Sequence, residues 1–152
     1  MLYNGHGGAI TYYIPKNNLL TSVSNSELAG NIKASVSGTF YAIGCPLLTG
    51  VVADNAASLN LANSVLLSSL VAPRATTISA SGCRLDAKSI GDILYQAVTA
   101  ERDNVSYDFS GGMNAYDTEI DDYLVATYNV RFTTIIAALQ LAGGAITYNR
   151  FI

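Results

Sequence analysis

A repeat with a period of ~19 residues in the middle of the chain constrains its fold more than any other feature. Segment 45–63 (CPLLTGVVADNAASLNLAN) aligns with segment 64–82 (SVLLSSLVAPRATTISASG), and apolar residues fall on apolar residues. The aligned pairs are Leu47 with Leu66, Leu48 with Leu67, Val51 with Leu70, Val52 with Val71, Ala53 with Ala72, Ala56 with Ala75, Leu59 with Ile78 and Leu61 with Ala80. Such a period indicates a solenoid, because each coil must bury its apolar side against its neighbours.

The repeat extends one period towards the N-terminus. The same apolar positions are there occupied by Leu28, Ile32, Ala34, Phe40 and Ala42. We expect six residues to be buried in matching stacked positions: Leu47, Val51 and Leu59 in one coil, and Leu66, Leu70 and Ile78 in the next. The Asn and Gly residues at positions 55, 63 and 82 suit tight corners between strands.

Longer units follow Cys83. Asp86 can cap a helix, and the apolar residues after it recur at helical spacing: Ile90, Ile93, Leu94, Ala97 and Val98. We expect this helix to end within 101–104, a strand and corner over 105–112, and a final strand over 145–151. Two further helices are predicted over 117–129 and 132–144, the first with Ile120, Tyr123, Leu124 and Tyr128 on one face, the second closing on Gly143 and Gly144. Coils made only of strands are therefore followed by coils in which a helix accompanies the strand.

The repeated positions resemble leucine-rich repeats, in particular the short, irregular repeats of bacterial surface proteins and phage structural proteins. The resemblance covers about residues 28–150. It implies an α/β fold: a leucine-rich-repeat-like solenoid of short parallel β coils followed by strand–helix units. We assign this solenoid domain to residues 28–152. Residues 1–27, which include the strand-like GAITYYIP at 8–15, form either an end cap or an arm that docks on a partner.

Charge is scarce in this chain. Charged residues make up 12% of it, against about 25% in an average soluble protein, and the net charge is −3. The eight basic residues are scattered, so nucleic acid is not an expected partner. No apolar run reaches the length that crosses a bilayer, and residues 1–13 do not resemble a signal peptide. Between Phe40 and Ile78 only Asp54 and Arg74 carry charge, which favours burial of this surface against other copies of the chain.

Two candidate sites of chemistry each have a simpler structural interpretation. His6, in NGHGG, has no nucleophile beside it in the sequence, and the chain has no second histidine. The simpler interpretation of His6 is a solvent-exposed loop residue. Asp117, Glu119 and Asp121 alternate as in a calcium loop, but positions six and twelve of such a loop are Asp122 and Tyr128 instead of Gly and Glu. These acids instead suit a helix N-terminus.

The two cysteines stand two periods apart in the repeat. Equivalent positions two strands apart lie about 9–10 Å from each other, which is too far for a disulfide. Cys45 and Cys83 are therefore expected to be buried free thiols. We assign no catalytic residue, no cofactor and no metal ligand.

Tyrosine is frequent and tryptophan is absent. Nine of the ten tyrosines are candidates for an interface or a carbohydrate-facing surface: Tyr3, Tyr12, Tyr13, Tyr41, Tyr107, Tyr116, Tyr123, Tyr128 and Tyr148.

These features predict a non-enzymatic structural and interaction protein. The resemblance and the low charge favour a phage virion component, such as a head fibre, capsid decoration or tail-associated protein. The alternative is a ligand-binding leucine-rich-repeat module of a bacterial surface adhesin, located at the cell surface. The expected partners are other copies of the chain, for which a trimer would suit a fibre, and virion proteins, with a host surface protein or glycan as a further candidate. Neither nucleic acid binding nor membrane insertion is expected.

Overall fold

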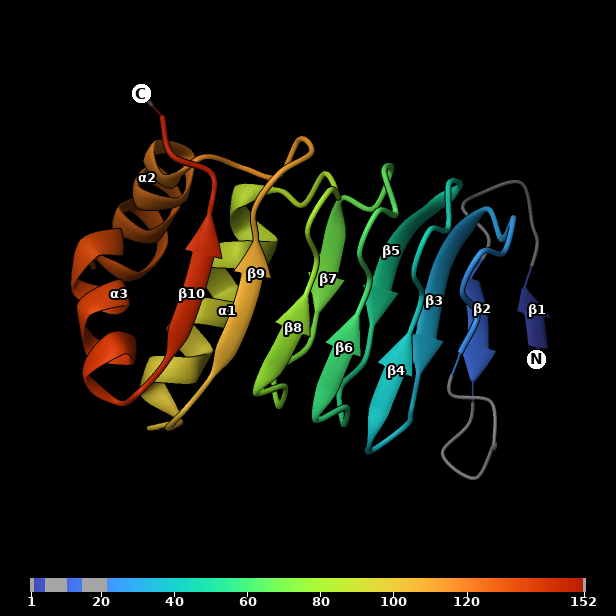
Figure 1. Ribbon diagram of the computed structural model, residues 1–152, viewed down its shortest axis with the longest axis horizontal. Helices are drawn as coiled ribbons and strands as arrows, with labels where there is room; N and C mark the ends of the chain where they lie inside the picture. Colours follow the sequence, from blue (N-terminus) through green and yellow to red (C-terminus); the bar gives the residue numbers. More distant parts are fainter. Residues whose placement is uncertain (1, 5–10, 15–21, 152) are drawn as a thin grey trace.

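The computed structural model describes residues 2–4, 11–14 and 22–151, and it contains two facing sheets (Figure 1). Sheet A has the order β1 (Leu2–Asn4), β2 (Thr11–Ile14), β3 (Gly30–Ala34), β5 (Leu48–Val52) and β7 (Ser69–Val71). Sheet B has the order β4 (Thr39–Tyr41), β6 (Ser58–Asn60), β8 (Thr77–Ser79), β9 (Ser106–Phe109) and β10 (Ala145–Tyr148). Every pairing among these strands is parallel except β1 with β2.

Each coil contributes one strand to each sheet, and successive coils stack at the predicted period. Val51 pairs with Leu70 in sheet A, and Leu59 pairs with Ile78 in sheet B. All four side chains are buried in the core between the sheets. The predicted solenoid of parallel coils is therefore confirmed as an architecture.

The prediction was wrong for the leucines at one corner. Leu47 and Leu66 are 43% and 41% exposed, whereas Leu48 and Leu67 are fully buried. The reason is a turn: the Leu67 N–H donates to the Ser64 carbonyl, and both of these residues face inward. The two residues between them project outward from the turn, so the inward position belongs to the second leucine of each pair.

A second corner places one residue per coil in the left-handed backbone region. Asn25, Gly44, Asn63 and Gly82 occupy equivalent positions in successive coils, with φ of 56°, 62°, 60° and 71°. The N–H of each donates to a carbonyl of the next coil, as Asn63 N does to Ser81 O at 2.8 Å. Asparagine and glycine alternate because the side chain of one occupies the space over the other: a Cβ on Gly82 would lie 2.6 Å from Asn63 Oδ1.

The two cysteines occupy the position after this corner, with Ser64 in the coil between them. Each side chain donates to a carbonyl of the preceding coil: Cys45 Sγ to Val23 O at 3.2 Å, Ser64 Oγ to Ala42 O at 2.6 Å, and Cys83 Sγ to Leu61 O at 3.1 Å. Both thiols are free and buried, as predicted. Burial raises the pKa of the Cys83 thiol to about 11.

Helix α1 (Ala87–Thr99) takes the place of the next strand in sheet A. Asp86 N donates to Ser68 O of the preceding coil, and the Leu70 N–H donates to Ser89 Oγ on the helix. The predicted cap is confirmed, since Asp86 Oδ1 accepts from Ser89 N at 2.7 Å. The helix therefore covers the edge of β7, while sheet B continues through β9 and β10 (Figure 1).

The two remaining helices lie at the C-terminal end of the solenoid, as predicted. They are α2 (Asp117–Tyr128) and α3 (Phe132–Leu141), and the C-cap of α3 is followed by Gly143, whose φ is 81°. No single helix in the described part of the chain is long and apolar enough to span a membrane. Together α2 and α3 would meet that criterion, but they bend by 96° at the break between them.

The N-terminal end of the solenoid begins before residue 28. Val23 N and Asn25 N donate to the carbonyls of Tyr41 and Ile43, so residues 22–25 already follow the edge of sheet B. In sheet A, β2 lies beside β3 and places Tyr12 opposite Ile32.

The corner correction predicts opposite outcomes for two adjacent leucines. Leu67→Ala should lower the free energy of unfolding by about 2–5 kcal/mol, because it leaves a cavity in the core. Leu66→Ala should change it by about 0.5 kcal/mol or less, because Leu66 lies on the outside of the turn. Urea denaturation of both variants measures the difference. Equal losses for the two leucines would contradict the register.

The left-handed corner predicts that Gly82→Ala destabilises the protein by about 1–3 kcal/mol, from backbone strain and the contact with Asn63. Gly38→Ala is the matched control, because Gly38 has no positive φ and no heavy atom lies within 4 Å of a Cβ placed there. Thermal unfolding compares them. A Gly82→Ala protein as stable as the control would exclude the proposed corner geometry.

Candidate functional site

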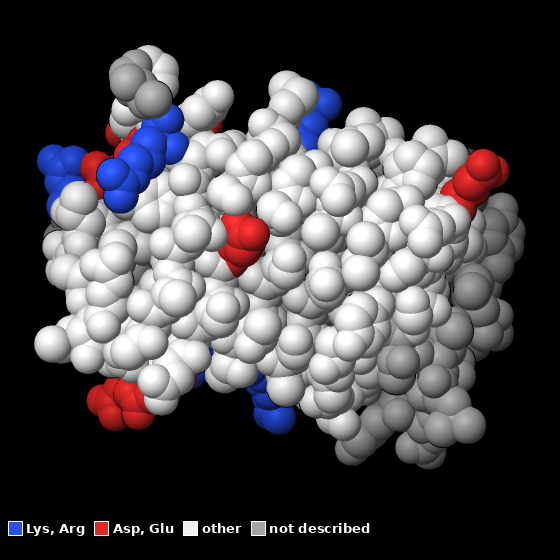
Figure 2. Space-filling model, in the orientation of Figure 1, with Lys and Arg blue, Asp and Glu red and all other residues white. Residues whose placement is uncertain are grey.

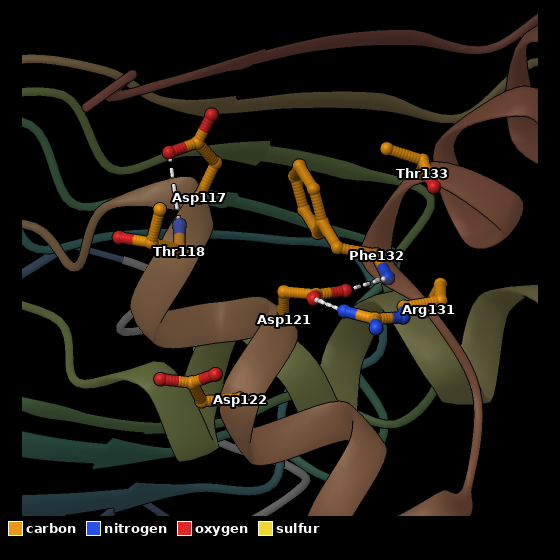
Figure 3. Close-up of a pocket in the computed structure, with 7 residues that line it drawn as sticks. All are labelled: Asp117, Thr118, Asp121, Asp122, Arg131, Phe132 and Thr133. Atoms are coloured by element: carbon orange, nitrogen blue, oxygen red, sulfur yellow. Dashed lines mark hydrogen bonds and ion pairs between the residues drawn. The ribbon is translucent and has the colours of Figure 1, made fainter. Parts of the chain in front are cut away.

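A pocket with a volume of about 430 Å³ lies between the N-terminal turns of α2 and α3 (Figure 3). Its walls carry three carboxylates, one guanidinium, two hydroxyls and one aromatic ring. The lining residues are Asp117, Thr118, Asp121, Asp122, Arg131, Phe132 and Thr133.

Asp121 is the best-connected side chain in this pocket. Its Oδ1 accepts the Phe132 N–H at 2.7 Å, and its Oδ2 pairs with Arg131 at 2.5 Å (Figure 3). The N-cap residue of α3 is Arg131, whose side chain makes no capping hydrogen bond, so Asp121 caps α3 from the neighbouring helix. The bond from Phe132, with a smaller contribution from Arg131, lowers the pKa of Asp121.

The acids that resembled a calcium loop bind different backbone groups. Asp117 accepts from the N–H groups of Thr118 and Phe151, and Glu119 accepts from the N–H of Tyr116 in a capping box. Asp121 caps α3, so each of the three carboxylates accepts a hydrogen bond from at least one backbone N–H group. Within the described residues, no group of three or more Asp, Glu, His or Cys side chains has the arrangement of a metal site.

A second polar cluster joins α1 to α2 around Asp92. Its Oδ1 accepts from the hydroxyls of Tyr123 at 2.6 Å and Tyr128 at 2.7 Å, and its Oδ2 pairs with Lys88 at 2.6 Å. Tyr128 also stacks on Tyr95, with ring centroids 3.8 Å apart. The hydrogen bond to Asp92 raises the pKa of Tyr128. The cluster holds the two helices together, which assigns a structural role to two of the nine tyrosines and to Tyr95, which the sequence analysis did not include.

The other tyrosines are dispersed. Tyr107 is buried and donates to Ala75 O at 2.7 Å, Tyr116 packs edge-on against Phe151, and Tyr148 packs edge-on against Phe132. The side chain of Tyr3 and all of His6 lie outside the described residues. The tyrosines whose side chains are described thus do not form one common surface.

The most extended candidate surface is the outer face of sheet B, which we call the polar face. It consists of two rows that cross five parallel strands: Thr39, Ser58, Thr77, Ser106 and Ala145 in one, and Tyr41, Asn60, Ser79, Asp108 and Thr147 in the other. Asp108 is the one charged residue in these rows. Figure 2, which views the molecule from this side, shows charged side chains mainly at the margin.

Asp108 is held within the polar face by its neighbours. Its Oδ1 accepts from the Ser110 hydroxyl at 2.6 Å, the Thr147 hydroxyl at 2.7 Å and the Ser110 N–H at 3.0 Å. Partial burial opposes ionisation, but these hydrogen bonds outweigh it and lower the pKa of Asp108. The carboxylate is therefore ionised at neutral pH.

The polar face has a sequence signal that the apolar repeat obscured. Polar residues flank the buried Phe40, Leu59 and Ile78 on both sides, as TFY, SLN and TIS at the spacing of the repeat. In a strand, such neighbours point to the opposite face from the buried residue. A comparison of the polar positions between repeats would have located this surface.

Comparison with known proteins gave no match: no family model, no curated protein and no solved structure is significantly similar to this chain.

Asp121 predicts a pH-dependent contribution to stability. Because its pKa is lowered in the folded protein, the contribution is present at neutral pH and is lost as the pH falls from about 5 towards 2. Asp121→Ala should lower the free energy of unfolding by about 0.5–2 kcal/mol at pH 7, the usual cost of a lost helix cap, and by less at pH 3.

The matched control is Asp122→Ala, an exposed acid in the same pocket for which no hydrogen bond is present among the described residues. Its stability should stay close to that of the unmodified chain at both pH values. Urea denaturation at pH 7 and pH 3 separates the two variants. A loss for Asp121→Ala that is equal at both pH values would exclude a capping carboxylate.

Proposed function

We propose that the chain is a non-enzymatic structural and interaction protein of a phage virion, a head fibre, decoration or tail-associated component, which binds other virion proteins through its polar face. The observation that carries the proposal is the polar face itself: two regular rows of mostly polar side chains, with Asp108 the one charged member, on a parallel sheet. Such a surface presents repeated hydrogen-bonding groups over several coils.

The distribution of charge supports an interaction role. A water-facing surface usually carries many charged residues, but coils 40–78 have only Asp54 and Arg74. The outward corner positions add apolar surface, since Leu47, Val65 and Leu66 are all exposed. Exposed apolar surface of this kind marks interaction sites, and we propose that other copies of the chain cover part of it.

A ligand-binding module of a bacterial surface adhesin is the second candidate. Tyr41 favours it, because its side chain is 39% exposed on the polar face beside Asn60. A ring that stacks on a sugar, next to amide and hydroxyl groups, would combine an apolar body with polar contacts. Binding of the isolated chain to a glycan array, reduced by Tyr41→Ala, would favour this candidate over the virion.

The virion proposal is tested by placing one charge on each side of the solenoid. Thr77→Lys lies on the polar face, and Ser69→Lys lies on the outer face of sheet A in the same coil; both positions are exposed. Particles from the host strain that carries the gene are purified after expression of each variant, and their content of the chain is measured by mass spectrometry.

Thr77→Lys should be depleted from particles about tenfold or more, while Ser69→Lys is retained, because a buried unpaired charge costs about 1.4 kcal/mol or more. Circular dichroism checks that both variants are folded. Absence of the unmodified chain from particles would contradict the virion assignment, and equal retention of both variants would contradict the role of the polar face.

A further inference from the structure

One corner of the solenoid carries a row of exposed side chains whose order of charge is self-complementary. The row has one member in each of four successive coils, two residues after the corner residue with positive φ. Its members, in chain order, are Glu27, Pro46, Val65 and Arg84, and all four are exposed. An acid therefore stands at one end of the row, a base at the other, and two apolar residues between them.

Exposed leucines widen the apolar centre of this row. Leu47 and Leu66 follow Pro46 and Val65 on the same turns and are also exposed. We call these four residues the corner patch. The turns that carry the patch join sheet B to sheet A along the upper margin of the molecule in Figure 1. In Figure 2 the right half of this margin shows one basic and one acidic group with only uncharged atoms between them.

The two charged ends of the row have no ionic partner within the described part of the chain. The ion pairs present there are Lys88 with Asp92 and Arg131 with Asp121. Both Glu27 and Arg84 are exposed, so each can meet an opposite charge on a second molecule without losing an internal contact described here.

The order of the row determines how a second copy can meet it. If two rows ran in the same direction, Glu27 would face Glu27 and Arg84 would face Arg84, and such like-charge contacts are unfavourable. If the rows ran in opposite directions, Glu27 of each copy would face Arg84 of the other. A two-fold axis midway between Pro46 and Val65 produces this second arrangement and brings the two corner patches together.

The antiparallel arrangement keeps the helical ends of the two copies apart. The row spans three coil spacings of about 4.8 Å each. Helices α2 and α3 lie beyond the Arg84 end of the row (Figure 1). Rotation about the two-fold axis sends the helices of the second copy in the opposite direction, so the two sets of helices lie at opposite ends of the contact.

We propose that two copies of the chain associate through their corner patches in antiparallel orientation, with Glu27 of each copy paired with Arg84 of the other. Removal of apolar surface from water favours the association, and the two ion pairs fix its direction. The contact is isologous and closes as a dimer. The inference rests on the self-association in the proposed function and names the surface that carries it.

One test places a charge in the corner patch. Leu66→Asp should weaken association about tenfold or more, because its carboxylate would be buried without a partner between two copies. Val71→Asp is the matched control, since Val71 is similarly exposed in the same coil but lies on the outer face of sheet A. Sedimentation velocity over a range of concentrations measures association of the full chain, and circular dichroism confirms that each variant is folded.

A second test reverses the charges at the ends of the row. Glu27→Lys alone brings like charges together at both ends of the dimer, and so does Arg84→Glu alone. We expect each single variant to associate about fivefold or more weakly than the unmodified chain. An equal mixture of the two variants restores opposite charges at both ends, so it should form a heterodimer about as tightly as the unmodified chain forms its dimer. Sedimentation velocity of the mixture, with one variant labelled, measures this.

The outcomes separate the contact from self-association in general. Equal association of Leu66→Asp and Val71→Asp overturns the corner contact but leaves self-association intact. A mixture of Glu27→Lys and Arg84→Glu that associates no more tightly than either variant alone overturns the antiparallel direction. A trimeric unmodified chain overturns the two-fold contact, and a monomeric one overturns self-association as well. The virion assignment is tested separately by the content of the purified particles.

Discussion

Hydrogen bonding between coils is the constraint on which this structure depends. No coil satisfies its own backbone, because successive segments of the chain lie in different sheets. The N–H groups of Ala42, Leu61 and Ala80 each donate to a carbonyl of the following coil. Buried backbone groups without partners are costly, so every coil depends on the next for its polar groups as well as for its apolar contacts. The sequence repeats at a fixed period because each coil must match the next one in this way.

The same constraint makes the ends of the solenoid the places where interaction is expected. In sheet A the chain itself covers the last strand edge. Helix α1 lies along β7, and Ser89 Oγ accepts the hydrogen bond from the Leu70 N–H that a further strand would otherwise accept. In sheet B the last strand is β10, and its outer edge has no paired strand among the described residues. Helices α2 and α3, held by Asp92 and Asp121, close the inner layer but add no strand to that edge.

The repeat was sufficient to predict the coils and the buried cysteines. The cap at Asp86 and the apolar spacing after it predicted the helix that follows, because spacing and capping chemistry are local properties. It misplaced Leu47 and Leu66, since two adjacent leucines offer two registers and only the turn at Ser64 selects between them. The cap on α3 was not predictable, because Asp121 and Phe132 belong to different helices that meet only in the folded chain. The polar face was predictable in principle, yet its signal lies in the residues between the apolar positions.

Native-state hydrogen exchange, resolved by residue, tests the coil-to-coil bonding most directly. The amides of Ala42, Leu61 and Ala80, and those of Gly44, Asn63 and Gly82, donate between coils. We predict that these two sets, each with one member per coil, exchange only through global unfolding and share one free energy of opening. Exchange of either set at the rate of exposed loops would contradict the stacked-coil account of this fold.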